Sequence, residues 1–397
     1  IIFAQEHTIP ITPRGGGTSR AGNELGPGIL IDFSKYMTGI VELNVKEKWV
    51  RVEPGIVLAE LNRMLKPHNL YFPIDPSTKD SATLGGMIAN NSSGPHAVKY
   101  GTTRSHVDGL ELVLANGEVL TTGSLRPTHG ENDSGTLGEK LVGEIPEILA
   151  RYEDYLEDER PFTSKNSCGY HVWDLMDGDS IDLTPLLVGS EGTLALVSEA
   201  KLNLSEIPEK VLSGFVYIDD LGKVGEATQE ILEENPSMIE IMEKHVLDLA
   251  RVQRPDLAEY FPENVEASLF IEFQEDSDQT LFDKFEAIRA RLMNDKNLAV
   301  DVVQARNSDD MKTFTKVRSI SGPILNRMKG PKRPIAFIED AAVHVSRLPE
   351  YISGLRELFE KFDVKAAIYG HAGDGNLHNM AILDLRCLLY TSPSPRD

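Results

Sequence analysis

The N-terminal half of the chain consists of short apolar runs separated by polar turns. Runs that predict strands lie at residues 9–12, 28–33, 40–53, 107–114, 118–122 and 186–204. Helical spacing of apolar residues predicts helices at 57–65 and at 137–156, the second as one helix or a pair. Asn116-Gly117 favours a tight turn, so we expect its flanking strands to form a hairpin.

The pattern changes near Ile207-Pro208, where proline interrupts strand pairing. Strands are then predicted at 212–218, 238–242, 267–273, 299–303, 335–339 and 365–369, and helices at 222–234, 277–293, 308–320 and 348–362. Strands and helices that mix in this way indicate an α+β fold. We expect two domains, at residues 1–207 and 208–386.

Composition excludes some classes of function. The formal net charge of −22 argues against nucleic-acid binding, which needs Lys and Arg to replace phosphate counterions. With two cysteines and no Cys-x-x-Cys pattern, the chain cannot build an iron–sulfur cluster or a thiolate zinc site. No apolar run reaches the ~18–20 residues that cross a bilayer, so we expect no transmembrane segment.

Both ends of the sequence look cut. The chain begins with Ile1 instead of Met, and residues 387–397 resemble the translation of a sequencing-library adapter. We therefore expect a fragment truncated at both ends and exclude 387–397 from the fold. Cys168 is then the only cysteine that belongs to the protein, and we interpret it as a packing residue because no base is identifiable beside it.

Three segments combine glycines with small polar residues. They are PRGGGTS at residues 13–19, PSTKDSATLGGMIANNSSG at 76–94 and GSEGTLA at 189–195. Consecutive glycines let backbone N–H groups converge on a phosphate, and Gly85-Gly86 is expected to open a short helix whose N-terminus faces one. The third segment lies among predicted strands, which suggests close approach of its backbone to a ligand. Ordinary tight turns are the alternative for each segment.

In this order, and with Tyr100-Gly101 after the second, the three segments resemble the PCMH-type FAD-binding domain of the vanillyl-alcohol oxidase superfamily. GHAGDGNLH at 370–378 resembles the D-lactate, glycolate and D-2-hydroxyglutarate dehydrogenase branch. The resemblance covers nearly all of residues 1–384. It implies an FAD-binding domain of two subdomains, followed by a cap with an antiparallel sheet.

The resemblance also implies which residues hold FAD. They are Arg14, Gly15, Gly16, Gly17, Thr18, Ser19, Pro76, Ser77, Thr83, Gly85, Gly86, Ala89, Asn90, Ser92, Gly94, Tyr100, Gly101, Glu191, Gly192 and Val197. Members that tether FAD resemble RSGGH in the glycine loop, where this chain has Gly17-Thr18. We therefore expect non-covalent FAD. Residues 165–170, KNSCGY, look like a family segment near the cofactor.

Three residues carry the expected chemistry in the second domain. His371 and His378 flank a glycine-rich turn that can aim both rings at one divalent metal ion, which would bind the substrate hydroxyl and carboxylate. By resemblance, this ion is Zn²⁺ or Mn²⁺. By resemblance, Arg318 clamps the substrate carboxylate. The alternatives are hydrogen-bonded loop histidines and a solvated arginine.

Two positions depart from the hydroxyglutarate members. They resemble YKYD where this chain has FIED at 337–340, so that Ile338 replaces a cation, and they tend to place Asn at the position of Met380. Both departures weaken the case for hydroxyglutarate itself. Glu339-Asp340 matches a family Glu/Asp position that orients ligands or caps the helix near Leu348.

The expected function is oxidation of a 2-hydroxy acid of D-lactate or glycolate type to the keto acid, by hydride transfer to FAD. By resemblance, the general base lies beyond residue 386, and electrons pass to a quinone, a cytochrome, an electron-transfer flavoprotein or an iron–sulfur protein or domain. The alternatives are a non-catalytic FAD-binding subunit and an oxygen-using alcohol or lactone oxidase. We expect a location in the cytoplasm or at the inner membrane face.

Overall fold

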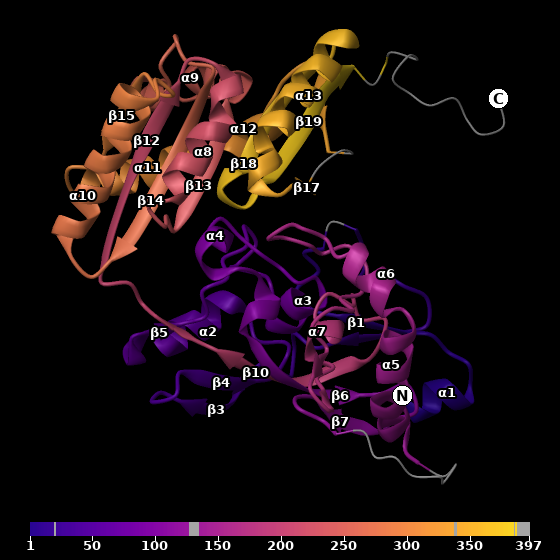
Figure 1. The fold of residues 1–397 in the computed structure, drawn as a ribbon. Coiled ribbons are helices and arrows are strands. Elements are labelled where there is room, and N and C mark those ends of the chain that lie inside the picture. The colour runs from indigo at the N-terminus through magenta and orange to yellow at the C-terminus, as the bar shows by residue number, and fades with distance from the viewer. Residues whose placement is uncertain (20, 127–134, 337–339, 385, 387–397) are drawn as a thin grey trace. The chain divides into compact units, whose positions relative to one another are not determined.

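The computed structural model describes residues 1–19, 21–126, 135–336, 340–384 and 386 (Figure 1). The predictions made for Ile338, Glu339 and residues 387–397 lie outside these ranges. The chain forms two compact units. The first comprises Ile1–Gly94, Tyr100–Pro161 and Asn166–Ile207, and the second comprises Pro95–Lys99, Phe162–Lys165 and the chain from Pro208 onward.

The first unit is built around an antiparallel five-stranded sheet with the order β3-β4-β10-β6-β7. Its strands are β3 (Ile40–Asn44), β4 (Trp49–Val52), β6 (Val107–Val113), β7 (Val119–Thr121) and β10 (Leu196–Asn203). The pairing of β6 with β7 confirms the predicted hairpin. A parallel pair, β1 (Ile11–Arg14) with β2 (Ile29–Asp32), leads into and out of the glycine loop.

Short strands and helices complete this unit. They are α1 (Ile2–Glu6), α2 (Leu58–Leu65), β5 (Leu70–Tyr71), α3 (Leu84–Ala89), α5 (Leu137–Arg151), α6 (Glu153–Asp158), β8 (Met176–Asp177), β9 (Ser180–Ile181), α7 (Thr184–Leu187) and β11 (Ser205–Glu206). Helix α4 (Ala97–Tyr100) belongs to the second unit except for Tyr100. The predicted helix at 57–65 buries Leu58, Leu61 and Leu65, as its spacing requires. The segment 137–156 forms a helix pair, one of the two forms expected.

The expectation that strands surround residues 189–193 is wrong on the N-terminal side. Residues 184–187 form helix α7, because Pro185 stands in its first turn and the Asp182 carboxylate accepts the Thr184 N–H at 2.8 Å. Strand β10 begins only at Leu196. The interpretation of Cys168 as a packing residue is also wrong, since its side chain is exposed.

The second unit contains an antiparallel sheet with the order β15-β12-β14-β13-β18-β19-β16, and β17 pairs with β19. The strands are β12 (Lys210–Ile218), β13 (Met238–Glu243), β14 (Ala267–Glu275), β15 (Asp301–Gln304), β16 (Lys332–Ile335), β17 (Ala341–Ala342), β18 (Lys365–His371) and β19 (Asn376–Asp384). The helices are α8 (Val224–Leu232), α9 (Lys244–Gln253), α10 (Asp278–Arg289), α11 (Ser308–Arg318), α12 (Ser321–Asn326) and α13 (Leu348–Lys361). The sequence patterns missed α9, α12, β17 and β19, and the strand predicted at 335–339 shares only Ile335 with β16.

Side chains that alternate along the strands build a separate core on each face of this sheet. Ile239 and Ile241 of β13 pack in the core that includes α8, α10 and α13. Met238 and Met242 pack in the core that includes α9, α11 and α12. Glu240 lies between these two methionines in the strand and therefore shares the face of the sheet that α11 covers. No helix in the described ranges is long and apolar enough to span a membrane.

Candidate functional site

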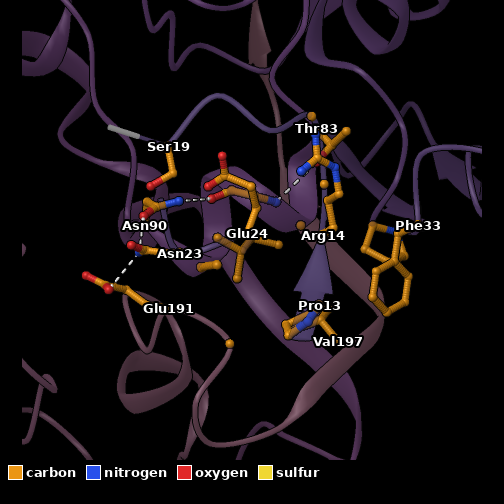
Figure 2. Close-up of a pocket in the computed structure, with 18 of the residues that line it drawn as sticks. Pro13, Arg14, Ser19, Asn23, Glu24, Phe33, Thr83, Asn90, Glu191 and Val197 are labelled. Atoms are coloured by element: carbon orange, nitrogen blue, oxygen red, sulfur yellow. Dashed lines mark hydrogen bonds between the residues drawn. The ribbon is translucent and has the colours of Figure 1, made fainter. Parts of the chain in front are cut away.

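A pocket in the first unit is built from the glycine-rich segments. The empty space between its walls is about 790 Å³, part of it open solvent (Figure 2). Of the residues implied to hold FAD, those that line it are Arg14, Gly15, Gly16, Gly17, Thr18, Ser19, Thr83, Gly85, Gly86, Ala89, Asn90, Glu191, Gly192 and Val197. These come from three stretches of sequence, which the fold brings together at one cavity.

The glycine loop has no room for side chains. A Cβ on Gly15 would lie 2.2 Å from Thr83 Oγ1, and one on Gly16 would lie 2.1 Å from the Ser81 carbonyl oxygen. Thr83 caps α3, because its Oγ1 accepts the Gly86 N–H at 3.3 Å. The backbone of the loop therefore packs directly on the start of α3. Such a surface exposes N–H groups instead of side chains, as a diphosphate requires.

Hydrogen bonds connect the other walls of the pocket. Asn23 Nδ2 donates to Glu191 Oε2 at 2.7 Å and to Asn90 Oδ1 at 3.3 Å, and Asn90 Nδ2 donates to the Gly86 carbonyl at 3.0 Å (Figure 2). The Glu191 N–H donates to the Ala89 carbonyl at 2.8 Å, and Glu191 adopts a left-handed φ of 55°. The segments around residues 23, 90 and 191 are thereby held as one surface.

The remaining residues implied to hold FAD do not line the pocket. These are Pro76, Ser77, Ser92, Gly94, Tyr100 and Gly101. Two of them make close contacts with residues outside the pocket lining. A Cβ on Gly94 would lie 2.4 Å from the Asp75 carbonyl oxygen, and the Ser92 carbonyl accepts the Thr103 hydroxyl at 2.7 Å.

Sequence reasoning missed other lining residues, among them Asn23, Glu24 and Phe33. Asn23 and Glu24 follow the glycine loop by only a few residues, and two consecutive polar residues next to a glycine-rich loop are a signal that could have found them. No His, Cys or Tyr stands among the described residues that line this pocket. Non-covalent binding of FAD stays a prediction.

A second group of polar side chains lies on the sheet of the second unit. Glu240 of β13 pairs in register with His371 of β18, and its Oε1 is hydrogen-bonded to His371 Nδ1. Its Oε2 accepts the Nε–H of Arg318, the last residue of α11, at 3.3 Å. One carboxylate therefore holds two of the three residues for which chemistry was expected. Glu240 itself was missed, although a lone acid in the apolar run Met-Ile-Glu-Ile-Met is a visible signal.

The charges of this group are strongly coupled. Burial favours the protonated form of Glu240, but His371 and Arg318 outweigh it and hold the pKa of the carboxyl well below its ordinary value. Burial acts to lower the pKa of His371, but the nearby Glu240 carboxylate raises this pKa by more than burial lowers it. The pKa of His371 is therefore above its ordinary value. At neutral pH we therefore expect an ionised Glu240 whose negative charge is shared between an imidazole and a guanidinium.

His378 lies beside His371, with the ring centroids 5.5 Å apart at 77°. His378 Nδ1 is 4.0 Å from Asp340 Oδ1, which accepts hydrogen bonds from Lys165 Nζ at 3.1 Å and from Asn376 Nδ2 at 3.0 Å. Lys165 Nζ also donates to Asn376 Oδ1 at 2.7 Å. These contacts connect the second histidine to a lysine from the short segment Phe162–Lys165.

Burial alone would raise the pKa of Asp340, but Lys165 and Asn376 lower it below the ordinary value. Asp340 itself can therefore act as a charged partner of His378. The orienting role of Glu339-Asp340 stays a prediction. Asp340 does not cap the helix at Leu348, because the N-cap of α13 is Arg347 and no side chain caps it.

The expected metal centre is not assembled by these residues. In the part of the chain that the structure describes, no group of three or more His, Cys, Asp and Glu side chains could hold a metal ion. Two imidazoles alone are fewer than the protein ligands of ordinary zinc sites. Zn²⁺ or Mn²⁺ at His371 and His378 thus stays a prediction without support from these residues.

Comparison with known families identifies both parts of the chain. Residues 1–123 match the FAD binding domain family, and residues 207–387 match the C-terminal domain of FAD linked oxidases. The glycolate oxidase subunit GlcD of Bacillus subtilis is 30% identical over 393 residues, which cover 97% of this chain and 70% of that protein. The chain belongs to the FAD-linked oxidase family. The predicted membership in the FAD-linked oxidases and dehydrogenases is thereby confirmed, and FAD is the cofactor of its first unit.

Other members of the FAD-linked oxidase family are also similar. D-2-hydroxyglutarate dehydrogenase of Pseudomonas putida is 33% identical over 391 residues, covering 95% of this chain and 39% of that protein. A mitochondrial D-lactate dehydrogenase [cytochrome] of Arabidopsis thaliana is 29% identical over 381 residues, covering 96% of the chain and 57% of that protein. The chain thus spans about two fifths of the hydroxyglutarate dehydrogenases that it matches.

Solved structures show the same fold. An alkyldihydroxyacetonephosphate synthase superposes with a TM-score of 0.61 at 17% identity, covering 96% of this chain and 67% of that one. The predicted fold class, a PCMH-type FAD-binding domain followed by an α+β domain with an antiparallel sheet, is confirmed.

Proposed function

We propose that the protein oxidises a small 2-hydroxy acid to the corresponding 2-keto acid with FAD as the primary acceptor. The observation that carries the proposal is the arrangement around Glu240, which holds an arginine and a histidine on one face of the sheet. A 2-hydroxy acid presents a carboxylate and a hydroxyl on neighbouring carbons. It therefore needs one cation and one proton acceptor placed close together.

Arg318 is the cation in this proposal. Its Nε–H is bonded to Glu240, so the guanidinium is oriented and its two terminal nitrogens can form parallel hydrogen bonds with the substrate carboxylate. The side chain is 22% exposed, which leaves it accessible from the face of the sheet. Glu240 at the same time limits the net positive charge that would otherwise be buried there.

His371 is the proposed proton acceptor. Because Nδ1 is bonded to the Glu240 carboxylate, the tautomer with the proton on Nδ1 is favoured, and Nε2 is left with the lone pair that can accept the substrate hydroxyl proton. The carboxylate also stabilises the imidazolium that results. Bound FAD supplies the acceptor for the hydride that leaves the α-carbon. The general base expected beyond residue 386 is then not the only candidate.

The names of the relatives support the substrate class, but they do not single out one acid. Proteins similar to this chain are called D-2-hydroxyglutarate dehydrogenase, glycolate oxidase subunit and D-lactate dehydrogenase. Their substrates share the carboxylate and the neighbouring hydroxyl that Arg318 and His371 are proposed to bind. We propose D-lactate, glycolate and D-2-hydroxyglutarate as the acids to compare, and an acceptor other than oxygen. The identity of that acceptor and a location in the cytoplasm or at the inner membrane face are proposals of the same standing.

An anaerobic spectral titration tests the proposal. The flavin absorbance of the protein is followed while each acid is added, with and without EDTA. We expect bleaching by at least one acid, and we expect Arg318→Met to raise the concentration needed by about 100-fold, because it removes charge-assisted hydrogen bonds to the carboxylate. Arg356→Met is the matched control, since Arg356 lies in α13 and is 3.6 Å from Asp220.

Each outcome has a separate meaning. Bleaching that EDTA abolishes would restore the metal and make His371 a ligand instead of a base. A flavin that none of the acids reduces would favour the non-catalytic subunit. Rapid release of peroxide in air would favour the oxygen-using oxidase.

A further inference from the structure

The pocket of the first unit contains a carboxylate oxygen without a partner. Glu24 lines the pocket, and its Oε2 is buried without a hydrogen-bond partner among the described residues (Figure 2). Glu191 lines the same pocket, but its carboxylate accepts the Asn23 amide N–H at 2.7 Å. Among the described residues, the Glu191 carboxylate therefore has a hydrogen-bond donor, whereas Glu24 Oε2 has none.

A buried acceptor without a donor is unfavourable, and most such groups in native proteins have a partner. An ionised carboxylate only accepts hydrogen bonds. A ligand that fills the pocket should therefore bring donors to Glu24.

The diphosphate of FAD cannot meet the requirement, because it is itself an anion that only accepts. The backbone N–H groups of Gly15–Gly17 and the Arg14 guanidinium, which line the same pocket, suit the diphosphate better than a carboxylate does. The ring N–H groups of FAD lie at the far ends of the molecule. The donors that flank the diphosphate on both sides are vicinal hydroxyls, those of the ribityl chain and those of the adenosine ribose.

We propose that Glu24 accepts hydrogen bonds from sugar hydroxyls of FAD and thereby fixes which part of the cofactor lies beside it. This rests on FAD occupying the pocket and does not depend on the oxidation of a hydroxy acid. The same carboxylate repels the diphosphate, so it helps to set the position of the cofactor along the pocket. Glu24 is a cofactor-binding residue in this assignment.

The test is a titration of the apo-protein with FAD, followed by quenching of flavin fluorescence. Glu24→Gln keeps the shape and one oxygen but removes the charge, and we expect FAD binding to weaken about 5- to 10-fold. Glu24→Ala removes both oxygens, and we expect a loss of about 30- to 100-fold. Glu157→Gln is the matched control, because it makes the same change in charge at an exposed position of α6.

Thermal unfolding of the apo-proteins separates binding from folding. Glu24 has a buried oxygen without a partner, so Glu24→Gln should leave the apo melting temperature unchanged or raise it while FAD affinity falls. A lower apo melting temperature with a parallel loss of affinity would assign Glu24 a structural role and overturn the proposal. Equal or tighter FAD binding by Glu24→Gln would also overturn it, because repulsion would then outweigh acceptance.

Fragments of the cofactor identify the hydroxyls. If Glu24→Ala weakens ADP and leaves FMN unchanged, the ribose is the partner, and the reverse result assigns the ribityl chain. If neither fragment is affected although wild-type protein binds both, the proposal is wrong. If the wild-type protein binds FAD but oxidises no hydroxy acid, this result counts against the proposed function alone.

Discussion

The two sites are built from different materials. The pocket of the first unit is made of backbone and small residues, and its tightest contacts join the glycine loop to the start of α3. The polar group of the second unit is made of long charged side chains, and Glu240, Arg318 and His371 come from positions far apart in the sequence. A backbone site depends on shape, whereas a side-chain site depends on balanced charge. Substitutions that alter shape alone or charge alone should therefore separate them.

The largest effect is expected from Gly16→Ala. The new Cβ would lie 2.1 Å from the Ser81 carbonyl oxygen, and because that atom is backbone the loop must move. We expect FAD affinity to fall by at least about 1,000-fold, or about 4 kcal/mol, measured by flavin fluorescence. Gly143→Ala is the matched control, since nothing lies within 4 Å of its Cβ in α5, and alanine favours a helix. Near-normal FAD binding by Gly16→Ala would show that the loop is not a rigid cradle.

Glu240→Gln tests the second site by charge without a change of shape. Gln still fits between Met238 and Met242 but no longer balances His371 and Arg318. We expect the rate of flavin reduction by the hydroxy acid to fall about 100-fold, or about 2.7 kcal/mol, with FAD affinity unchanged. The control is Glu266→Gln, an acid of the same unit that pairs with Lys244 near the surface. Equal losses from both variants would remove Glu240 from the site.

The difference in materials also explains what could be predicted from the sequence. The residues of the glycine loop and of α3 are contiguous, so their composition alone indicates a phosphate-binding surface, and most of them line the pocket. Glu240 and Lys165 become significant only when β13 meets β18 and when the segment Phe162–Lys165 joins the second unit. No local pattern encodes such pairings. Helix α7 was missed because Leu186–Leu187 read as a continuation of the apolar run that ends in β10.

Lys165→Met is expected to have a smaller effect. It removes two hydrogen bonds, to Asn376 and to Asp340, and leaves the Asp340 carboxylate without its cation. We expect kcat/KM for the hydroxy acid to fall about 10-fold, or about 1.4 kcal/mol. The double variant Lys165→Met/Asp340→Asn should recover part of the loss, because it removes both charges and leaves no carboxylate without its cation. Strictly additive losses would show that the lysine and the aspartate act independently.

The smallest effect concerns stability and is confined to the second unit. Glu272 of β14 is nearly buried, and its Oε1 contacts His96 Nε2 at 3.0 Å and accepts hydrogen bonds from Ser237 and Gln274. Burial raises the pKa of Glu272, but His96 and the two other donors lower it more, so the net shift is below 4.5. A carboxyl whose folded pKa is depressed stabilises the fold above its unfolded pKa and loses this contribution as the pH falls through the folded pKa.

We therefore expect Glu272→Gln to lower the free energy of unfolding by about 1 kcal/mol at pH 7, and we expect this difference to shrink below about pH 4.5. Trp49 and Trp173 both belong to the first unit, so tryptophan fluorescence follows that unit, whereas hydrogen exchange of β14 peptides follows the second. Glu263→Gln at an exposed position serves as the control. Faster exchange in β14 with unchanged fluorescence would place the charge-dependent stability in the second unit. If the difference in unfolding free energy between wild type and Glu272→Gln does not change with pH, the charge of Glu272 does not contribute to it.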